Sequence, residues 1–221
     1  MIALAAAVSG ALALSAASDM DEFKPADERH AACLAGISEN AETGYEDALA
    51  WRHMGGGWPA EHCVSLALMA LGENEAGAAR LRAAAEGAIT ATPESRALMF
   101  GQAGDGYMAA GLFEEAASAF ERAADFAPED SGMALGRAKA ALALEDHAQA
   151  EEWGVRAASL NPERAEAYVV VGNARLAQRD LDGAESAMRA GREVAPENID
   201  LLLLRGAINE ARRTGQVVTL D

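Results

Sequence analysis

Four side chains in the N-terminal part of the chain could do chemistry together: Cys33, Cys63, His30 and His62. Thiolates and imidazoles bind zinc, and two thiols can also be oxidised to a disulfide. His62 and Cys63 are adjacent, so on a helix they point about 100° apart, and a shared tetrahedral site would need distortion. The chain has two cysteines, and an even number favours a disulfide in an exported protein. The sequence therefore favours a disulfide over a metal site, with two free buried thiols as the remaining alternative.

Residue patterns typical of enzymes are absent from the sequence. It contains no Ser-His-Asp set, no nucleophile elbow and no HExxH motif. The glycines at 55–57 are not followed by Lys-Ser/Thr and predict a helix break, not a phosphate-binding loop. The acidic pairs Glu114-Glu115 and Glu151-Glu152 fall on solvated faces of predicted helices, which argues against a catalytic pair. We expect a protein that is not an enzyme, uses no cofactor and has no evident small-molecule substrate.

The 221-residue chain is acidic, with 35 acidic and 18 basic residues and a net charge of −17. Nucleic acids and anionic membrane surfaces are bound by clustered lysines and arginines, so the composition argues against both as partners. The charge favours a solvated surface that keeps an alanine-rich protein soluble. Attraction of a basic partner is the alternative interpretation.

Residues 1–17 contain no charged side chain and are followed at once by acidic residues. The apolar run is too short for a comfortable membrane span and ends with Ser15 and Ala17, small residues at the two sites that a signal peptidase reads. The pattern predicts a signal peptide cleaved after Ala17, although no basic residue precedes the apolar run. We expect a periplasmic or secreted protein whose mature chain has no membrane span; an uncleaved anchor is the alternative.

A period of 34 residues organises the second half of the chain. Pro128, Pro162 and Pro196 lie 34 residues apart, with Pro93 standing 35 residues before the first. Small residues follow the same period at two sites: Gly104, Ala138 and Gly172, and Ala116, Ala150 and Ala184. A closing proline and a small residue in each of two helices are typical of stacked helix pairs.

These residues resemble the tetratricopeptide repeat (TPR) family, here as an exported bacterial-type member. Three repeats match its register: residues 97–128, 131–162 and 165–196, within a regular segment 93–198. The resemblance implies an all-α fold, a right-handed superhelical solenoid of helix–turn–helix repeats. Four residues depart from the family pattern: Arg137, Gly154, Met188 and Gly191.

On both sides of the regular repeats, the helical pattern continues without the full period. Residues 18–92 read as degenerate TPR-like helix pairs, with a turn at 40–44 and another turn-like stretch at 87–94. Residues 199–213 predict a helix that caps the stack, and together with a loose tail it forms the segment 199–221.

The TPR resemblance supports the disulfide. Cys33 and Cys63 lie near the starts of first helices in successive pairs, and in a TPR-like stack such helices are neighbours and roughly parallel. At equal depth, their facing Cα atoms come within range of a bridge. A redox-sensitive structural module that uses this pair is the alternative function.

The resemblance also implies a binding surface, since positions 2, 5, 9 and 12 of each first helix line the concave face in this family. Counted from Ala97, Ser131 and Ala165, the candidate binding residues are Leu98, Asp105, Met108, Leu135, Lys139, Leu142, Val169, Asn173 and Leu176.

The fifth positions are Gly101, Leu135 and Val169, all small or apolar. The Lys and Asn arrangement with which some family members clamp a C-terminal carboxylate is therefore missing, apart from Asn173. We predict a non-catalytic protein–protein interaction scaffold of the cell envelope or periplasm. Its groove is expected to bind an internal peptide or a folded protein surface.

Overall fold

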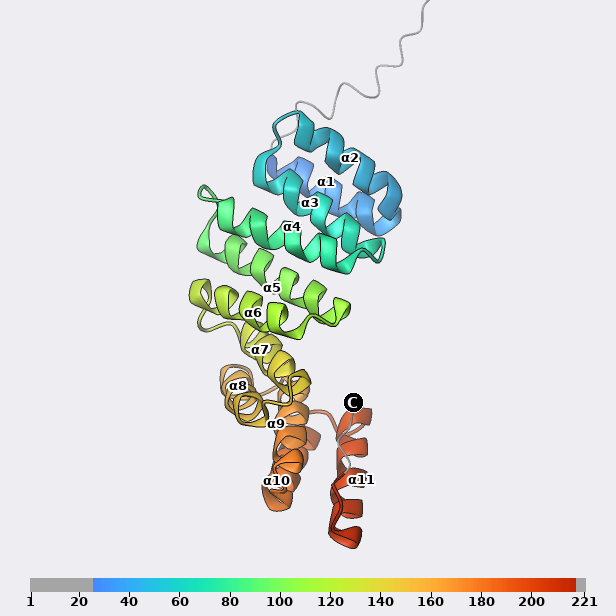
Figure 1. The fold of residues 1–221 in the computed structure, drawn as a ribbon, viewed down its shortest axis with the longest axis vertical. Coiled ribbons are helices and arrows are strands. Elements are labelled where there is room, and N and C mark those ends of the chain that lie inside the picture. Colours follow the sequence, from blue (N-terminus) through green and yellow to red (C-terminus); the bar gives the residue numbers. More distant parts are fainter. Residues whose placement is uncertain (1–25, 218–221) are drawn as a thin grey trace, which may run out of the picture.

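The structure, a computed structural model, describes residues 26–217, and this part of the chain contains helices and no strands. Eleven helices follow one another across these residues and stack into an elongated array (Figure 1). The helices from α7 onward are turned relative to those before them, as in a superhelix. The predicted solenoid of helical repeats is confirmed, whereas the predicted signal peptide, residues 1–17, lies outside the described residues.

The helices fall into three groups. The N-terminal group is α1 (Ala26–Glu39), α2 (Ala41–His53), α3 (Gly57–Ala70) and α4 (Asn74–Gly87). The regular repeats are α5 (Pro93–Ala110) with α6 (Phe113–Phe126), α7 (Ser131–Ala143) with α8 (His147–Leu160), and α9 (Ala165–Ala177) with α10 (Leu181–Val194). A single helix, α11 (Ile199–Thr214), follows the last pair.

Short polar residues fix where several helices begin. Thr92 caps α5 through the backbone N–H of Ser95, and Pro93 occupies the first turn, where its missing N–H costs nothing. Asp146 and Asp180, 34 residues apart, cap the second helices of consecutive repeats with their carboxylates. The period is therefore present in the local backbone signals as well as in the packing residues.

Close helix approach depends on glycines facing Phe120. A Cβ atom at Gly104 would lie 2.7 Å from the Phe120 ring, and one at Gly136 would lie 2.3 Å from it. Both distances are far below van der Waals contact, so only glycine allows the buried Phe120 ring to lie between α5 and α7. This interlock joins the first regular repeat to the second.

Two departures from the family pattern have a local explanation. The Arg137 guanidinium lies 4.0 Å from the centre of the Trp153 ring and pairs with Glu121 at 3.3 Å, so its charge is held at the edge of the core. A Cβ atom at Gly154 would lie 2.8 Å from Val171, whose side chain fills the space usually taken by a second-helix aromatic residue.

The predicted turn at 40–44 is wrong for all but its first residue. Asn40 caps α2 by accepting a hydrogen bond from the Thr43 N–H, and the helix starts at Ala41. Gly44 is buried, and a Cβ atom there would lie 2.8 Å from the Ile37 backbone, so glycine allows the close contact between α1 and α2. Asparagine and glycine serve here as a cap and a close-packing residue, two uses that share their composition with a turn.

Candidate functional site

A pocket of about 580 Å³ opens between α5, α7 and α9, the first helices of the regular repeats. Residues from these helices and from the adjoining turns line it: Met108, Phe113, Lys139, Leu142, Ala143, Glu145, His147, Asn173, Leu176 and Ala177. Five of the nine predicted binding residues are in this set, namely Met108, Lys139, Leu142, Asn173 and Leu176. The structure thus brings all three predicted twelfth positions and two of the three predicted ninth positions into one pocket, while Asp105 is not part of its lining.

The pocket combines apolar walls with polar atoms that have no partner. Met108, Leu142 and Leu176 supply the apolar walls, while the Lys139 side chain is exposed, as predicted. Asn173 Oδ1 and His147 Nδ1 are buried and make no hydrogen bond within the described residues. Because buried polar atoms are normally paired, a ligand that offers hydrogen bonds to them has a free-energy advantage here.

Asp105 modifies the charge of the groove. It lies one repeat before Lys139, at the matching ninth position. Loss of solvation raises the pKa of the Asp105 carboxyl, and the nearby positive charge of Lys139 opposes this rise. The Asp105 carboxylate, when ionised, partly balances the charge of Lys139, which reduces the attraction of the groove for anions.

The remaining predicted residues lie outside the pocket lining. Leu98 is 48% exposed in the second turn of α5, and Val169 is half-buried in α9. Leu135 is only 4% exposed and belongs to the core cluster between α7 and α9, so it supports the groove from beneath.

Sequence reasoning missed Phe113, Glu145 and His147, which come from second helices and a turn, and also Ala143 and Ala177, the last residues of α7 and α9. The family positions describe first helices alone, and they give no signal for these residues. Glu145 lies in the α7–α8 turn with a positive φ of 59°. Glutamate rarely adopts this conformation, so the residue type does not predict it.

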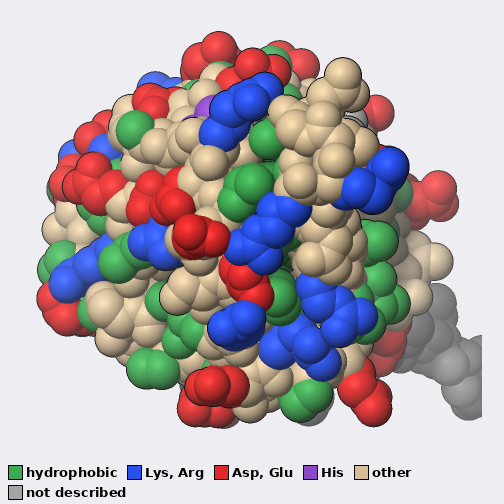
Figure 2. Space-filling view, turned by 90° about the horizontal axis from the view of Figure 1, so that it is seen from below, with side chains coloured by type: hydrophobic (Ala, Val, Ile, Leu, Met, Phe, Trp, Pro, Cys, Tyr) green, Lys and Arg blue, Asp and Glu red, His purple; other side chains and the backbone are tan. Residues whose placement is uncertain are grey.

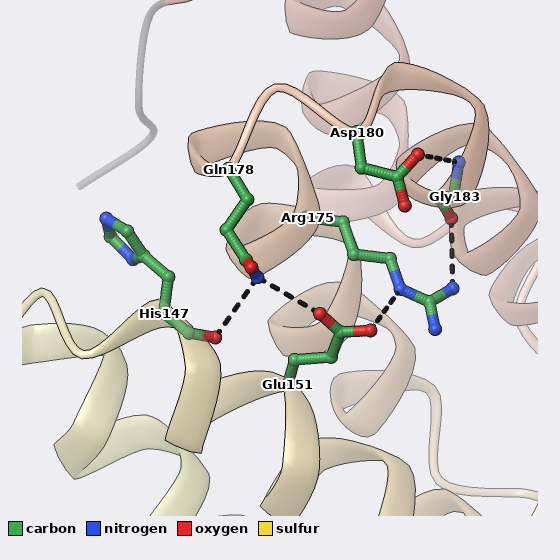
Figure 3. Close-up of polar contacts among 6 residues, drawn as sticks. All are labelled: His147, Glu151, Arg175, Gln178, Asp180 and Gly183. Carbon is green, nitrogen blue, oxygen red and sulfur yellow. Dashed lines mark hydrogen bonds and ion pairs between the residues drawn. The ribbon is translucent and has the colours of Figure 1, made fainter.

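Polar contacts among α8, α9 and α10 hold the His147 end of the pocket (Figure 3). The Glu151 carboxylate accepts hydrogen bonds from Arg175 Nε at 2.8 Å and from Gln178 Nε2 at 3.0 Å. Gln178 also donates to the backbone carbonyl of His147 at 3.4 Å, and Arg175 to that of Gly183 at 3.3 Å. These bonds cross three helices, so the rim of the pocket is fixed by the fold before a ligand arrives.

The four reactive side chains of the N-terminal part form one cluster between α1 and α3: His30, Cys33, His62 and Cys63. Cys33 and Cys63 lie at disulfide-bonding distance, with Cα atoms 6.4 Å apart. Cys63 is fully buried and Cys33 half-buried, so reductants have poor access to the sulfurs. Bridge formation in the cell stays a prediction, and this burial favours a structural use over a redox one.

The two histidines of this cluster form a hydrogen-bonded chain with Gln102 of α5. His30 Nε2 and His62 Nδ1 are 2.8 Å apart, and His62 Nε2 is 2.7 Å from Gln102 Oε1. Burial lowers the pKa of His62, which the hydrogen bond to Gln102 opposes. Within residues 26–217, no three His, Cys, Asp or Glu side chains are arranged to hold a metal ion.

Comparisons with known proteins agree with the repeat fold. No family model matches the sequence. A stretch of 128 residues is 33% identical to RNA polymerase II-associated protein 3 of Xenopus tropicalis, covering 58% of this chain and 18% of that protein. The first TPR domain of Spaghetti, solved with the HSP90 peptide SRMEEVD, superposes with a TM-score of 0.52 and 27% identity over 56% of this chain and 98% of that domain. The described residues have the fold of tetratricopeptide repeat domains, and the chain resembles such domains in sequence.

The chain spans about a fifth of the length of the curated relatives that it matches. Pseudomonas aeruginosa pilF covers more of it, with a TM-score of 0.66 over 87% of both chains, but at 18% identity this likeness shows the fold alone. None of the helices within residues 26–217 is both long enough and apolar enough to cross a bilayer.

Proposed function

We propose that this TPR protein is a non-catalytic scaffold that binds an extended, internal segment of a partner protein in the groove between α5, α7 and α9. The observation that carries the proposal is the pocket itself, in which Met108, Leu142 and Leu176 surround space for an apolar side chain. Asn173, with its unpartnered carbonyl oxygen, is placed to accept a hydrogen bond from the backbone of a ligand. The HSP90 peptide on the related Spaghetti domain supports a peptide as the kind of ligand.

The chemistry of the groove favours an internal segment over an acidic C-terminus. The HSP90 peptide ends in acidic residues, and recognition of such an end needs several cations close together. Among the described residues, Lys139 is the one lysine or arginine that lines this pocket, and Asp105 partly balances its charge. The partner segment is therefore apolar at its centre, with a single polar or acidic residue near Lys139.

We also propose that the protein works in the cell envelope or periplasm, on the basis of residues 1–17. N-terminal sequencing of protein from its native cells checks this, since cleavage after Ala17 gives a chain that begins at Ser18. Recovery of soluble chain that starts at Met1 would exclude export.

Site-specific crosslinking tests the groove. A photoreactive residue is placed at Met108 in the pocket and, as a matched control, at Val155, which is 46% exposed on α8 outside the pocket lining. Adducts formed in native cells at Met108 and not at Val155 identify the partner and its contact segment by mass spectrometry.

The identified partner is then titrated against the double variant Lys139→Glu/Leu142→Ala. A drop in affinity of at least tenfold is expected from loss of both the cation and the apolar wall. The circular dichroism spectrum checks that the variant is folded. Unchanged affinity of the folded variant would show that the partner binds elsewhere.

A further inference from the structure

The last helix continues the repeat register as a first helix. Ile199 lies 34 residues after Ala165, the first position of the preceding repeat. In the same register, Leu202 takes the place of Tyr168, and Gly206 takes the place of Gly172. α11 is therefore the first half of another repeat.

In the first regular repeat, these two positions contact the second helix of the same repeat. Phe100, equivalent to Leu202, stacks on Phe126 of α6 with ring centres 5.8 Å apart. A Cβ atom at Gly104, equivalent to Gly206, would meet the Phe120 ring of the same helix at 2.7 Å. These first-helix residues are thus normally covered by an antiparallel helix.

On α11 the corresponding face is open. Ile199 is 70%, Leu202 37% and Leu203 53% exposed, and a Cβ atom at Gly206 would have no neighbouring atom within 4 Å. We call these four residues the α11 open face. The opposite side of α11 is filled, because Leu204 is buried there against α9 and α10. The open face therefore presents an apolar ridge and a notch where the fold elsewhere receives a second helix.

The charge around this face differs from that of the rest of the molecule. Residues 175–213 contain seven arginines and seven acidic residues, whereas the whole chain has a net charge of −17. Arg205 is exposed and makes no ion pair within the described residues, and Figure 2, a view of this end, shows Lys and Arg side chains gathered beside hydrophobic ones. Because this segment is neutral and Arg205 is left without an ion pair among the described residues, an acidic side chain of a partner can pair with Arg205, which favours an acidic partner over a basic one at this face.

We propose that the α11 open face binds one amphipathic, acidic α-helix of another protein, which lies antiparallel to α11 and takes the place of a second repeat helix. A small residue of that helix faces Gly206, its apolar side chains cover Leu202 and Leu203, and an acidic residue pairs with Arg205. This surface is distinct from the groove, so either site can fail its test without affecting the other.

A peptide with the sequence of α6 is a suitable probe, because this helix is amphipathic and acidic and already fulfils the role in the first regular repeat. The peptide Phe113–Phe126 is fluorescently labelled, held helical by a lactam on its solvent face, and titrated into the full chain. We expect saturable binding that weakens at least tenfold in Leu203→Asp. Arg205→Glu is expected to weaken it severalfold at low salt and less at high salt.

Three further variants test whether the peptide binds at the α11 open face. Gly206→Leu fills the notch without a clash inside the chain, so it should reduce binding in a folded protein. Val155→Asp, at an exposed apolar residue of α8, and Leu142→Ala in the groove should leave binding unchanged. Absence of saturable binding, or binding that survives Leu203→Asp and Gly206→Leu, would overturn the proposal.

Light scattering of the chain alone tests the competing occupant. If a second copy of this chain covers the open face, the wild-type protein is a dimer at micromolar concentration and Leu203→Asp is a monomer. That result would overturn the assignment to another protein. A wild-type monomer that binds the acidic helix supports it.

Discussion

The two halves of this solenoid are held together in different ways. Between α1 and α5, the contacts include a pair of cysteines at bonding distance, the chain from His30 through His62 to Gln102, and the ion pairs of Glu61 with Arg52 and Arg80. Between α5 and α10, the core is made largely of alanine and glycine with single large side chains between them. Where the period weakens, a cysteine pair at bonding distance and polar links add to the apolar packing of the helices.

The difference has a physical cause. In the regular repeats, a small residue recurs at the same depth in every pair, so each helix finds a matching surface on the next. The N-terminal pairs lack this match, and directional bonds of high specificity supply the register between α1, α3 and α5. Each link in that region should therefore have local effects, while a fault in the regular core should spread to both neighbouring repeats.

Removal of the Phe120 side chain should give the largest effect. Phe120→Ala leaves a cavity between Gly104 and Gly136 that two glycines cannot fill, and we expect a loss of about 3–5 kcal/mol in the free energy of unfolding. Urea unfolding measures this loss, and hydrogen exchange should show faster opening of α5, α6 and α7 together. Phe113→Ala, at a half-buried residue outside the core clusters, is the matched control and should cost much less.

Loss of the cysteine pair comes next. A bridge between Cys33 and Cys63 closes a loop with a sequence separation of 30, and the chain-entropy model then gives a stabilisation of about 3–4 kcal/mol. The double variant Cys33→Ala/Cys63→Ala should lower the melting temperature and increase hydrogen exchange in α1–α4, with little change in α7–α10.

Alkylation and intact mass provide the direct check on the same bond. Oxidised, natively folded protein should contain no thiol that reacts after unfolding. Two reactive thiols in that sample would contradict the bridge. The N-terminal half would then have no covalent link between α1 and α3.

How far the sequence predicts this molecule also differs between the halves. The recurring prolines and small residues predict the regular helices to within a few residues, because the same helix–helix contact occurs in each of the three repeats. In the N-terminal half, Asn40 and Gly44 suggested a turn where the structure has a cap and a buried contact. Asparagine and glycine occur in turns, in helix caps and at close contacts. The N-terminal half does not repeat this contact, so the sequence does not show which of these roles applies.

The groove was predictable in part for the same reason. Met108, Lys139, Leu142, Asn173 and Leu176 occupy the first-helix positions that line the groove in this family, and they were found. Phe113 and His147 are also 34 residues apart, but they begin second helices, which those positions do not include. The hydrogen bond between His30 and His62 could not be predicted from the sequence. Histidines and cysteines at this spacing can be metal ligands or hydrogen-bonded partners, and the sequence does not distinguish the two.

Acidification should weaken the N-terminal half selectively. His62 has a pKa lowered by burial from its ordinary value of 6.5, so the unfolded chain binds this proton more readily than the folded one. The stabilisation from neutral His62 is present above pH 6.5 and is lost as the pH falls below it. Protonation of His62 Nδ1 also removes the acceptor that faces His30.

The check is hydrogen exchange of α1–α4 measured between pH 7.5 and 5.5, corrected for the intrinsic exchange rate. His62→Gln keeps a side chain capable of hydrogen bonding but does not titrate in this range, and it should flatten the profile of these helices. A wild-type profile as flat as that of the variant would show that the histidine chain is not coupled to stability.

The smallest effect is expected from Arg137, a polar link of the N-terminal kind placed within the regular half. Its guanidinium lies over Trp153 and pairs with Glu121, which is itself mostly exposed. An exposed ion pair contributes little, so most of the stabilisation comes from contact with the ring, about 0.5–1 kcal/mol. Arg137→Ala should therefore cost about 1 kcal/mol in urea unfolding, and Glu121→Ala should cost much less. Because the contact with Trp153 is one of packing more than of charge, the cost of Arg137→Ala should persist at 1 M salt. If the cost disappears in salt, the ion pair carries the interaction, and the regular half depends on polar links as the N-terminal half does.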